Sequence, residues 1–195
     1  MDVDIALPPP DMAIDTRGEE SECRLIDQAR QDPEAFARLY RLHYPRMAGY
    51  IHRRTGQREV AEDLVGDVFL TALKNLPRYR HGEAPFRAWL YRIASNAVNQ
   101  WARRERRRLR REQGHAMPAD GASLDSPDGH IVRRALLSID PKQQDILILH
   151  HLEGLGIEQI ALVLGRPAGT IKSRLHRARE ALRRVLADAR GKDHT

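Results

Sequence analysis

The 195-residue sequence has almost no cysteine, few aromatic residues and no long apolar run. Its single cysteine, Cys23, excludes an intrachain disulfide framework and a cysteine-rich zinc site. Aromatic residues make up 5% of the sequence, which argues against an all-β domain. No apolar stretch approaches the ~20 residues of a membrane-spanning helix, and the N-terminus lacks the basic-then-apolar pattern of a signal peptide. We therefore expect a cytoplasmic protein without membrane insertion.

Charged residues, by contrast, are abundant. They make up 31% of the chain beside 41% hydrophobic residues, which allows a modest core. The formal net charge of +6 indicates a polyanionic partner such as nucleic acid. Apolar residues recur at helical spacing through most of the chain. We therefore predict an all-α protein of two small helical domains joined by a flexible linker.

The clearest motif is a pair of helices joined by a tight turn in residues 156–186. Ile160 and Leu164 belong to the apolar stripe of the first helix, and Gly165 permits the turn. We expect Thr170 to be the N-cap of the second helix. That helix has an apolar face and an opposite polar, basic face, as in a helix-turn-helix whose second helix enters the major groove. An ordinary amphipathic hairpin with a solvated basic face is the alternative.

A second motif is an acidic helix predicted over residues 57–76. Glu59, Asp63 and Asp67 lie opposite its apolar stripe, and Glu62 lies on the flank. Taken alone, the pattern favours a solvated face that balances nearby arginines. Sites for hard cations usually gather oxygens from a loop or from several elements, so we expect no metal here.

A third motif is the helix that Pro85 opens. Phe86 and Trp89 are assigned to the core, whereas asparagine, glutamine, tyrosine and arginine side chains occupy the remaining positions. Amides can read base edges, aromatic rings can stack on unpaired bases and arginines bind phosphates. Seven arginines in residues 103–111 extend this helix. The combination suits single-stranded or distorted DNA better than an intact duplex.

Turn and capping residues divide the chain into five segments. We expect a short helix over residues 21–31, and a long helix that Asp32 caps and that ends at Gly56. Asp140 is expected to cap a helix of the second domain. The segments are a disordered acidic tail (1–21), a first domain (22–111), a linker (112–130), a second domain (131–187) and a tail (188–195).

Two stretches of the sequence resemble two conserved segments of one protein family, and they occur in the same order as in that family. They are AEDLVGDVFLTALKNLPRYRHGEAPFRAWLYRIASNAVNQWARR (residues 61–104) and DPKQQDILILHHLEGLGIEQIALVLGRPAGTIKSRLHRAREALRR (residues 140–184). The chain resembles bacterial RNA polymerase sigma factors of the extracytoplasmic-function (ECF) type, in the sigma-70 family. With the preceding helices, the resemblance covers residues 22–111 and 131–187. It implies a transcription initiation factor rather than an enzyme.

The resemblance also implies which residues bind each partner. Those for docking on the beta-prime clamp helices of core RNA polymerase are Glu62, Asp63, Leu64, Asp67 and Phe69. Those for melted minus-ten promoter DNA are Tyr91, Arg92, Asn96, Asn99, Gln100, Trp101, Arg103 and Arg104. Those for minus-thirty-five duplex DNA are Thr170, Lys172, Ser173, Arg174, His176 and Arg177. Further implied partners are the beta subunit and an anti-sigma factor.

Two other functions compete with this interpretation. A helix-turn-helix regulator that binds duplex DNA alone would leave the acidic helix and the amide-bearing helix without a role. A DNA recombinase or nuclease would need a positioned nucleophile or metal carboxylates, and no such group stands out. Adjacent His150 and His151 should diverge on a helix, with no third ligand evident. We therefore expect no catalytic residue, no metal or other cofactor and no small-molecule substrate.

Overall fold

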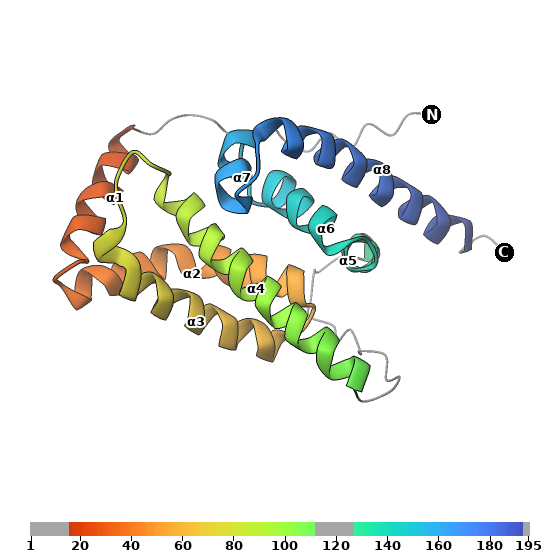
Figure 1. The fold of residues 1–195 in the computed structure, drawn as a ribbon, viewed down its shortest axis with the longest axis horizontal. Helices are drawn as coiled ribbons and strands as arrows, with labels where there is room; N and C mark the ends of the chain where they lie inside the picture. The colour runs from red at the N-terminus through yellow and green to blue at the C-terminus, as the bar shows by residue number, and fades with distance from the viewer. Residues whose placement is uncertain (1–15, 112–126, 193–195) are drawn as a thin grey trace.

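The computed structural model describes residues 16–111 and 127–192, and every regular element in these ranges is helical (Figure 1). This confirms the predicted all-α fold. The first unit consists of α1 (Thr16–Gln28), α2 (Pro33–Thr55), α3 (Arg58–Asn75), a 3-10 turn (Leu76–Arg78) and α4 (Phe86–Arg111). The second unit consists of α5 (Pro127–Ser138), α6 (Pro141–Leu147), a π-helical turn (Ile148–Leu152), α7 (Ile157–Leu164) and α8 (Ala168–Lys192). Predictions for residues 1–15, 112–126 and 193–195 fall outside the described residues.

Local capping chemistry sets several helix ends where the sequence predicted them. The Asp32 carboxylate accepts a hydrogen bond from the backbone N–H of Glu34 at 2.9 Å, and Gly56 ends the same helix in the left-handed conformation. Asp140 caps α6 in the same way as Asp32 caps α2. Gly165, with φ of 60°, makes the turn between α7 and α8.

Other helix ends differ from the prediction. The helix α1 begins at Thr16 rather than at residue 21, and α5 begins at Pro127, so residues 127–130 are helical rather than linker. The predicted N-cap role of Thr170 is wrong. Its backbone N–H already donates to the carbonyl of Pro167 at 2.9 Å, which places Thr170 inside the first turn of α8.

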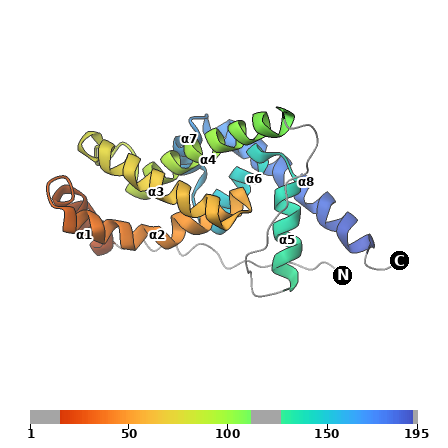
Figure 2. The same cartoon turned by 90° about the horizontal axis from the view of Figure 1, so that it is seen from below.

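Each unit is built around one long helix, and the two units share a continuous apolar core. In the first unit, α2 packs against α1, α3 and α4; in the second, α8 packs against α5, α6 and α7. The units meet where α7 lies against α4 and where α6 approaches α2 (Figures 1 and 2). Among the described helices, none combines the length and apolar character needed to cross a bilayer.

Candidate nucleic-acid interface

The acidic side of α3 is the first candidate surface. Glu62, Asp63 and Asp67 are all exposed, and Arg58 Nε donates to Glu62 Oε1 at 2.9 Å. Because Asp63 and Asp67 are four residues apart, they lie on the same face of the helix. The predicted carboxylates therefore form a surface that a basic partner can reach.

The two apolar residues predicted to join this surface are in the core instead. Leu64 is 9% exposed and Phe69 is 4% exposed, and the Phe69 ring packs against Tyr40 with centroids 4.6 Å apart. Both side chains are therefore largely covered by the protein itself, although Leu64 also lines the groove between α3 and α4. Leu70 and Leu73 are exposed by 56% and 43%, although sequence reasoning did not select them. The three-residue spacing from Asp67 to Leu70 and from Leu70 to Leu73 was the signal that could have found them.

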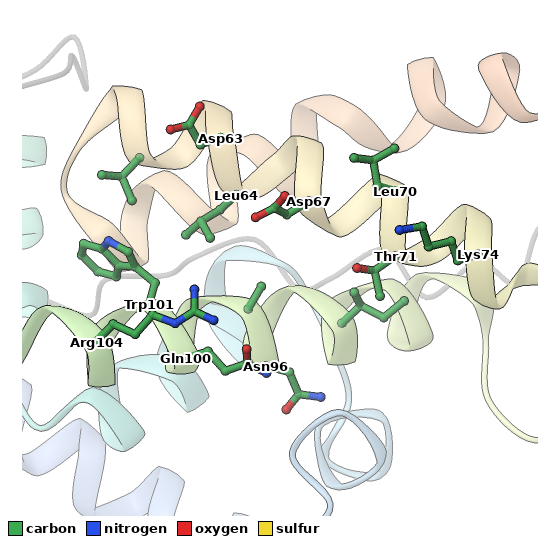
Figure 3. Close-up of a pocket in the computed structure, with 13 residues that line it drawn as sticks. Asp63, Leu64, Asp67, Leu70, Thr71, Lys74, Asn96, Gln100, Trp101 and Arg104 are labelled. Atoms are coloured by element: carbon green, nitrogen blue, oxygen red, sulfur yellow. The ribbon is translucent and has the colours of Figure 1, made fainter.

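A groove of about 660 Å³ runs between the exposed sides of α3 and α4 (Figure 3). Figure 3 shows α3 side chains on one wall and α4 side chains on the other. The α3 wall includes Asp63, Asp67, Leu70, Thr71 and Lys74, and the α4 wall includes Asn96, Gln100, Trp101 and Arg104. Residues predicted for polymerase docking and for minus-ten DNA thus border the same groove. Because carboxylates repel phosphates, a DNA strand in this region is expected to run along the α4 wall.

The predicted minus-ten residues on α4 differ in accessibility. Those with exposed side chains are Arg92, Asn96, Gln100, Arg103 and Arg104, and Trp101 is half-buried. The amide of Asn99 is engaged on both sides: Arg54 Nη2 donates to its oxygen at 3.0 Å, and its nitrogen donates to Ser95 Oγ at 3.3 Å. Five of the eight predicted residues are therefore exposed on the surface of α4.

Tyr91 does not fit the predicted role of stacking on a DNA base. Its side chain is fully buried, and its hydroxyl donates a hydrogen bond to the carboxylate of Glu153 in the second unit. Burial, followed by the Glu153 charge, raises the pKa of Tyr91, so the hydroxyl stays protonated. Tyr91 lies on α4, but its side chain faces the interior.

The helix-turn-helix has the predicted division of faces on α8. Ile171, Leu175 and Ala178 are buried. The predicted contact residues Lys172, Ser173, His176 and Arg177 are exposed on the other side, whereas Thr170 and Arg174 are half-buried. The Ser173 hydroxyl donates to the carbonyl of Thr170 at 3.1 Å, which leaves its oxygen available to accept a hydrogen bond. This surface presents cations and short polar groups suited to a DNA groove.

His150 and His151 do not diverge as the sequence predicted. They lie in the π-helical turn, and their ring centroids are 4.7 Å apart. His150 Nδ1 is 3.1 Å from the carbonyl of Leu155, and Arg179 Nε donates to His151 Nε2 at 3.1 Å. Desolvation, together with His150 and Arg179, lowers the pKa of His151 to about 4, so the ring is neutral near pH 7. Within the described ranges, no group of three potential metal ligands is present.

Models of known protein families match both units. The model for sigma-70 region 2 matches residues 39–108, and the model for sigma-70 region 4 matches residues 130–182. The first match contains α3 and the part of α4 that lines the groove, and the second contains α7 and the first part of α8.

Full-length relatives lead to the same family. The chain is 32% identical over 160 residues to RNA polymerase sigma factor YlaC of Bacillus subtilis, covering 78% of this chain and 92% of YlaC. It is 32% identical over 184 residues to the RNA polymerase sigma-H factor of Pseudomonas aeruginosa, covering 86% and 95% respectively. Its match to the ECF sigma factor BldN of Streptomyces coelicolor, 31% identical, covers 84% of this chain and 65% of BldN. The chain belongs to the ECF sigma factors of the sigma-70 family, which direct RNA polymerase to promoters.

Solved structures also resemble this fold. The sigma factor RpoE of Bartonella quintana, crystallised with the anti-sigma factor NepR, superposes with a TM-score of 0.68 at 27% identity. That match covers 78% of this chain and 96% of RpoE. CnrH, in complex with the cytosolic domain of CnrY, superposes with a TM-score of 0.65 at 25% identity, covering 84% and 96%.

Proposed function

We propose that this initiation factor divides promoter recognition between its two units and acts in the cytoplasm without catalysing a reaction itself. The observation that carries this proposal is the groove between α3 and α4, which carboxylates border on one side and amide, aromatic and guanidinium groups on the other. One wall suits a basic protein and the other suits a nucleic-acid strand. No positioned nucleophile is needed, because the polymerase performs the chemistry.

Docking on core polymerase is assigned to Glu62, Asp63 and Asp67. The exposed Leu70 adds apolar area beside these charges, which matches the apolar centre and charged rim of many protein interfaces. The buried Leu64 and Phe69 hold α3 on the core and so fix the position of the carboxylates on its exposed face. The partner surfaces are the beta-prime clamp helices and, for the second unit, the beta subunit.

Minus-ten recognition is assigned to the exposed face of α4. The amide of Asn96 has both a donor and an acceptor and can pair with the edge of an extruded base. Gln100 and Trp101 lie one turn further along, and Arg103 and Arg104 follow as phosphate contacts. Binding of flipped bases offsets an unstacking cost of about a few kcal/mol. The protein can therefore trap melted DNA by binding alone.

Minus-thirty-five recognition is assigned to α8. We assign base reading to Ser173 and His176, whose side chains are exposed, and phosphate binding to Lys172, Arg174 and Arg177. An anti-sigma factor is a further proposed partner. It is supported by the two similar structures, in which the sigma factors RpoE and CnrH are bound to NepR and CnrY.

Run-off transcription tests the proposal directly. Purified core polymerase is supplied with a promoter library, with and without this protein. Transcripts that start at defined sites only when the protein is present support it. Site-specific binding to duplex DNA without any effect on transcription would favour the regulator, and DNA cleavage without polymerase would favour the nuclease.

A further inference from the structure

A crevice of about 390 Å³ lies between the two units. Side chains of α4 line it from the first unit, and side chains of α6, α7, α8 and the turn between α7 and α8 line it from the second. Ligand pockets in proteins typically measure ~300–1,000 Å³ and often occur where domains meet. The crevice therefore has the size and the position of a small-molecule site.

Five cations line this crevice, and four different places in the fold supply them. They are Arg103 and Arg106 of α4, Lys142 of α6, Arg166 of the α7–α8 turn and Arg174 of α8. Within residues 16–111 and 127–192, no ion pair joins any of the five to a carboxylate. Like charges held close together repel, so an anion between them stabilises the arrangement.

Two carboxylates also border the crevice, but they do not cancel this charge. Asp140 is exposed, and its Oδ1 accepts a 2.9 Å hydrogen bond from a backbone N–H in the first turn of α6. Asp145 is 3% exposed, and the Tyr50 and Ser95 hydroxyls donate to its two oxygens. Arg54 Nε lies 3.6 Å from Asp145 Oδ1 and balances its charge. The accessible wall therefore has five cations and one exposed carboxylate.

The cations suit a chain of phosphates better than a single anion. A guanidinium donates two parallel hydrogen bonds to a phosphate, and a lysine supplies a point charge. The cationic wall continues past Arg174 into a smaller hollow of about 180 Å³, which Lys142 and Arg177 also border. Cations spread over two adjoining hollows can each contact a different phosphate group of one ligand.

The rest of the lining suits a nucleoside. Pro141 and Leu164 contribute apolar surface. The amide of Asn99 is already bonded to Arg54 and Ser95, whereas the exposed Asn96 amide keeps a donor and an acceptor for a base edge. Apolar surface beside an amide, next to a cationic wall, matches the two ends of a nucleotide.

We propose that the crevice binds a nucleoside triphosphate, with its phosphates among the five cations and its base beside Asn96 and Leu164. The ligand binds reversibly, and no bond is made or broken. Asn96, Arg103 and Arg174 are also assigned to promoter DNA, so nucleotide and DNA compete for them. This consequence rests on the proposed function, whereas nucleotide binding itself does not.

The test measures nucleotide binding to the full chain without polymerase or DNA. The probe is ATP with a fluorescent N-methylanthraniloyl group on its ribose, followed by anisotropy at about 150 mM salt, which screens non-specific attraction. Unlabelled ATP, GTP, CTP, UTP and inorganic tripolyphosphate then compete with the probe. The site variant is Lys142→Gln with Arg166→Gln, because neither residue is assigned to DNA. The matched control, Arg183→Gln with Arg184→Gln, removes the same charge from exposed positions of α8 outside the crevice.

We expect saturable binding of one nucleotide per chain and unchanged affinity in the control. The site variant should bind at least ~10-fold more weakly, because two charge-assisted phosphate contacts are lost. At least one of the four nucleotides should displace the probe about 10-fold better than tripolyphosphate, since a base adds contacts that phosphates lack. If circular dichroism shows that the site variant loses helix, Arg106→Gln with Arg166→Gln replaces it.

Three results would overturn the proposal: no saturable binding, equal losses in the site variant and the control, or tripolyphosphate that competes as well as the best nucleotide. Run-off transcription by the wild type separates this inference from the proposed function. Nucleotide binding without promoter-directed transcription would disprove the proposed function alone. Promoter-directed transcription without nucleotide binding would disprove the nucleotide site alone.

Discussion

The Tyr50 hydroxyl donates a 2.6 Å hydrogen bond to Asp145, although the two residues are 95 positions apart in the sequence. Burial, reinforced by the Asp145 charge, raises the pKa of Tyr50 well above its usual value, so this donor is permanent at physiological pH. The bond joins a helix assigned to the polymerase-binding unit to the unit that carries the helix-turn-helix. The bond therefore depends on the packing of the two units against each other and on neither unit alone.

The acidic face of α3 can be tested by charge reversal. Asp63→Arg with Asp67→Arg should leave the fold intact, since both residues are exposed. It should weaken binding to core polymerase at least ~10-fold, because like charges across an interface cost several kcal/mol. Titration of labelled protein with core polymerase measures this. Glu34→Arg with Glu158→Arg makes the same charge change elsewhere and should bind normally; equal losses in both pairs would contradict a specific docking face.

Phe69 and Leu70 are sequence neighbours with opposite surroundings. Phe69→Ala should lower the free energy of unfolding by about 3–5 kcal/mol, because the ring is 4% exposed. Leu70→Ala, at a position 56% exposed, should change it by less than ~0.5 kcal/mol but weaken polymerase binding. Urea denaturation and the polymerase titration give both quantities. If Phe69→Ala had normal stability but weak polymerase binding, Phe69 would instead be a polymerase contact residue.

Features that depend on neighbouring residues were predictable from the sequence. The caps at Asp32, Gly56 and Asp140 form because a side chain or a glycine acts on backbone groups a few positions away. The faces of α8 follow from helical periodicity in the same way. Thr170 is an exception. The carbonyl of Pro167 accepts hydrogen bonds from the backbone N–H groups of Thr170 and Ile171, so α8 begins before Thr170 and not at it.

Features that depend on distant partners were not predictable. Asp145 and Glu153 look like ordinary surface acids in the sequence, and only the packing of α6 and α7 on the first unit buries them. Tyr91 was assigned to DNA because tyrosine suits base stacking, yet its hydroxyl bonds to a residue 62 positions away. The residue type indicates which chemistry is possible, whereas the fold decides which partner it meets.

Asn96 provides a test of base capture. Asn96→Ala should reduce open-complex formation, measured by permanganate reactivity of the melted region, while binding to core polymerase is retained. The reason is loss of an amide that both donates to and accepts from a base edge. A pre-melted template should restore only part of the activity, and full restoration would limit Asn96 to the opening step. Asn75→Ala removes an amide that bonds Thr71 at the end of α3 and serves as control.

Substitutions in α8 should distinguish residues that set base preference from residues that contribute only affinity. Ser173→Ala or His176→Ala should change which bases are preferred at the minus-thirty-five element. Arg177→Ala should weaken binding to all sequences and reduce the salt dependence, as expected for a phosphate contact. Selection from randomised upstream DNA, repeated at two salt concentrations, distinguishes these effects. If all three variants shift base preference alike, the proposed division of roles is wrong.

The segment between the units sets how far apart they can bind. Because α4 ends at Arg111 and α5 begins at Pro127, the 15 residues 112–126 connect the two units. Fully extended, 15 residues reach at most ~50–54 Å. Positions −10 and −35 are about 25 base pairs apart, or roughly 85 Å along a duplex that rises ~3.4 Å per base pair. The remaining distance must come from the dimensions of the units themselves.

Deleting eight of these fifteen residues removes ~26–29 Å of reach. Transcription from promoters with both elements should then collapse, because each unit raises the local concentration of the other at its site only while the connection can span the gap. Binding to core polymerase through α3 should persist, since that surface lies wholly within the first unit. A Gly/Ser replacement of equal length keeps the reach and should have a much smaller effect. Run-off transcription from one-element and two-element templates measures both variants. Normal transcription by the shortened protein would mean that the two units do not bind one promoter at the same time.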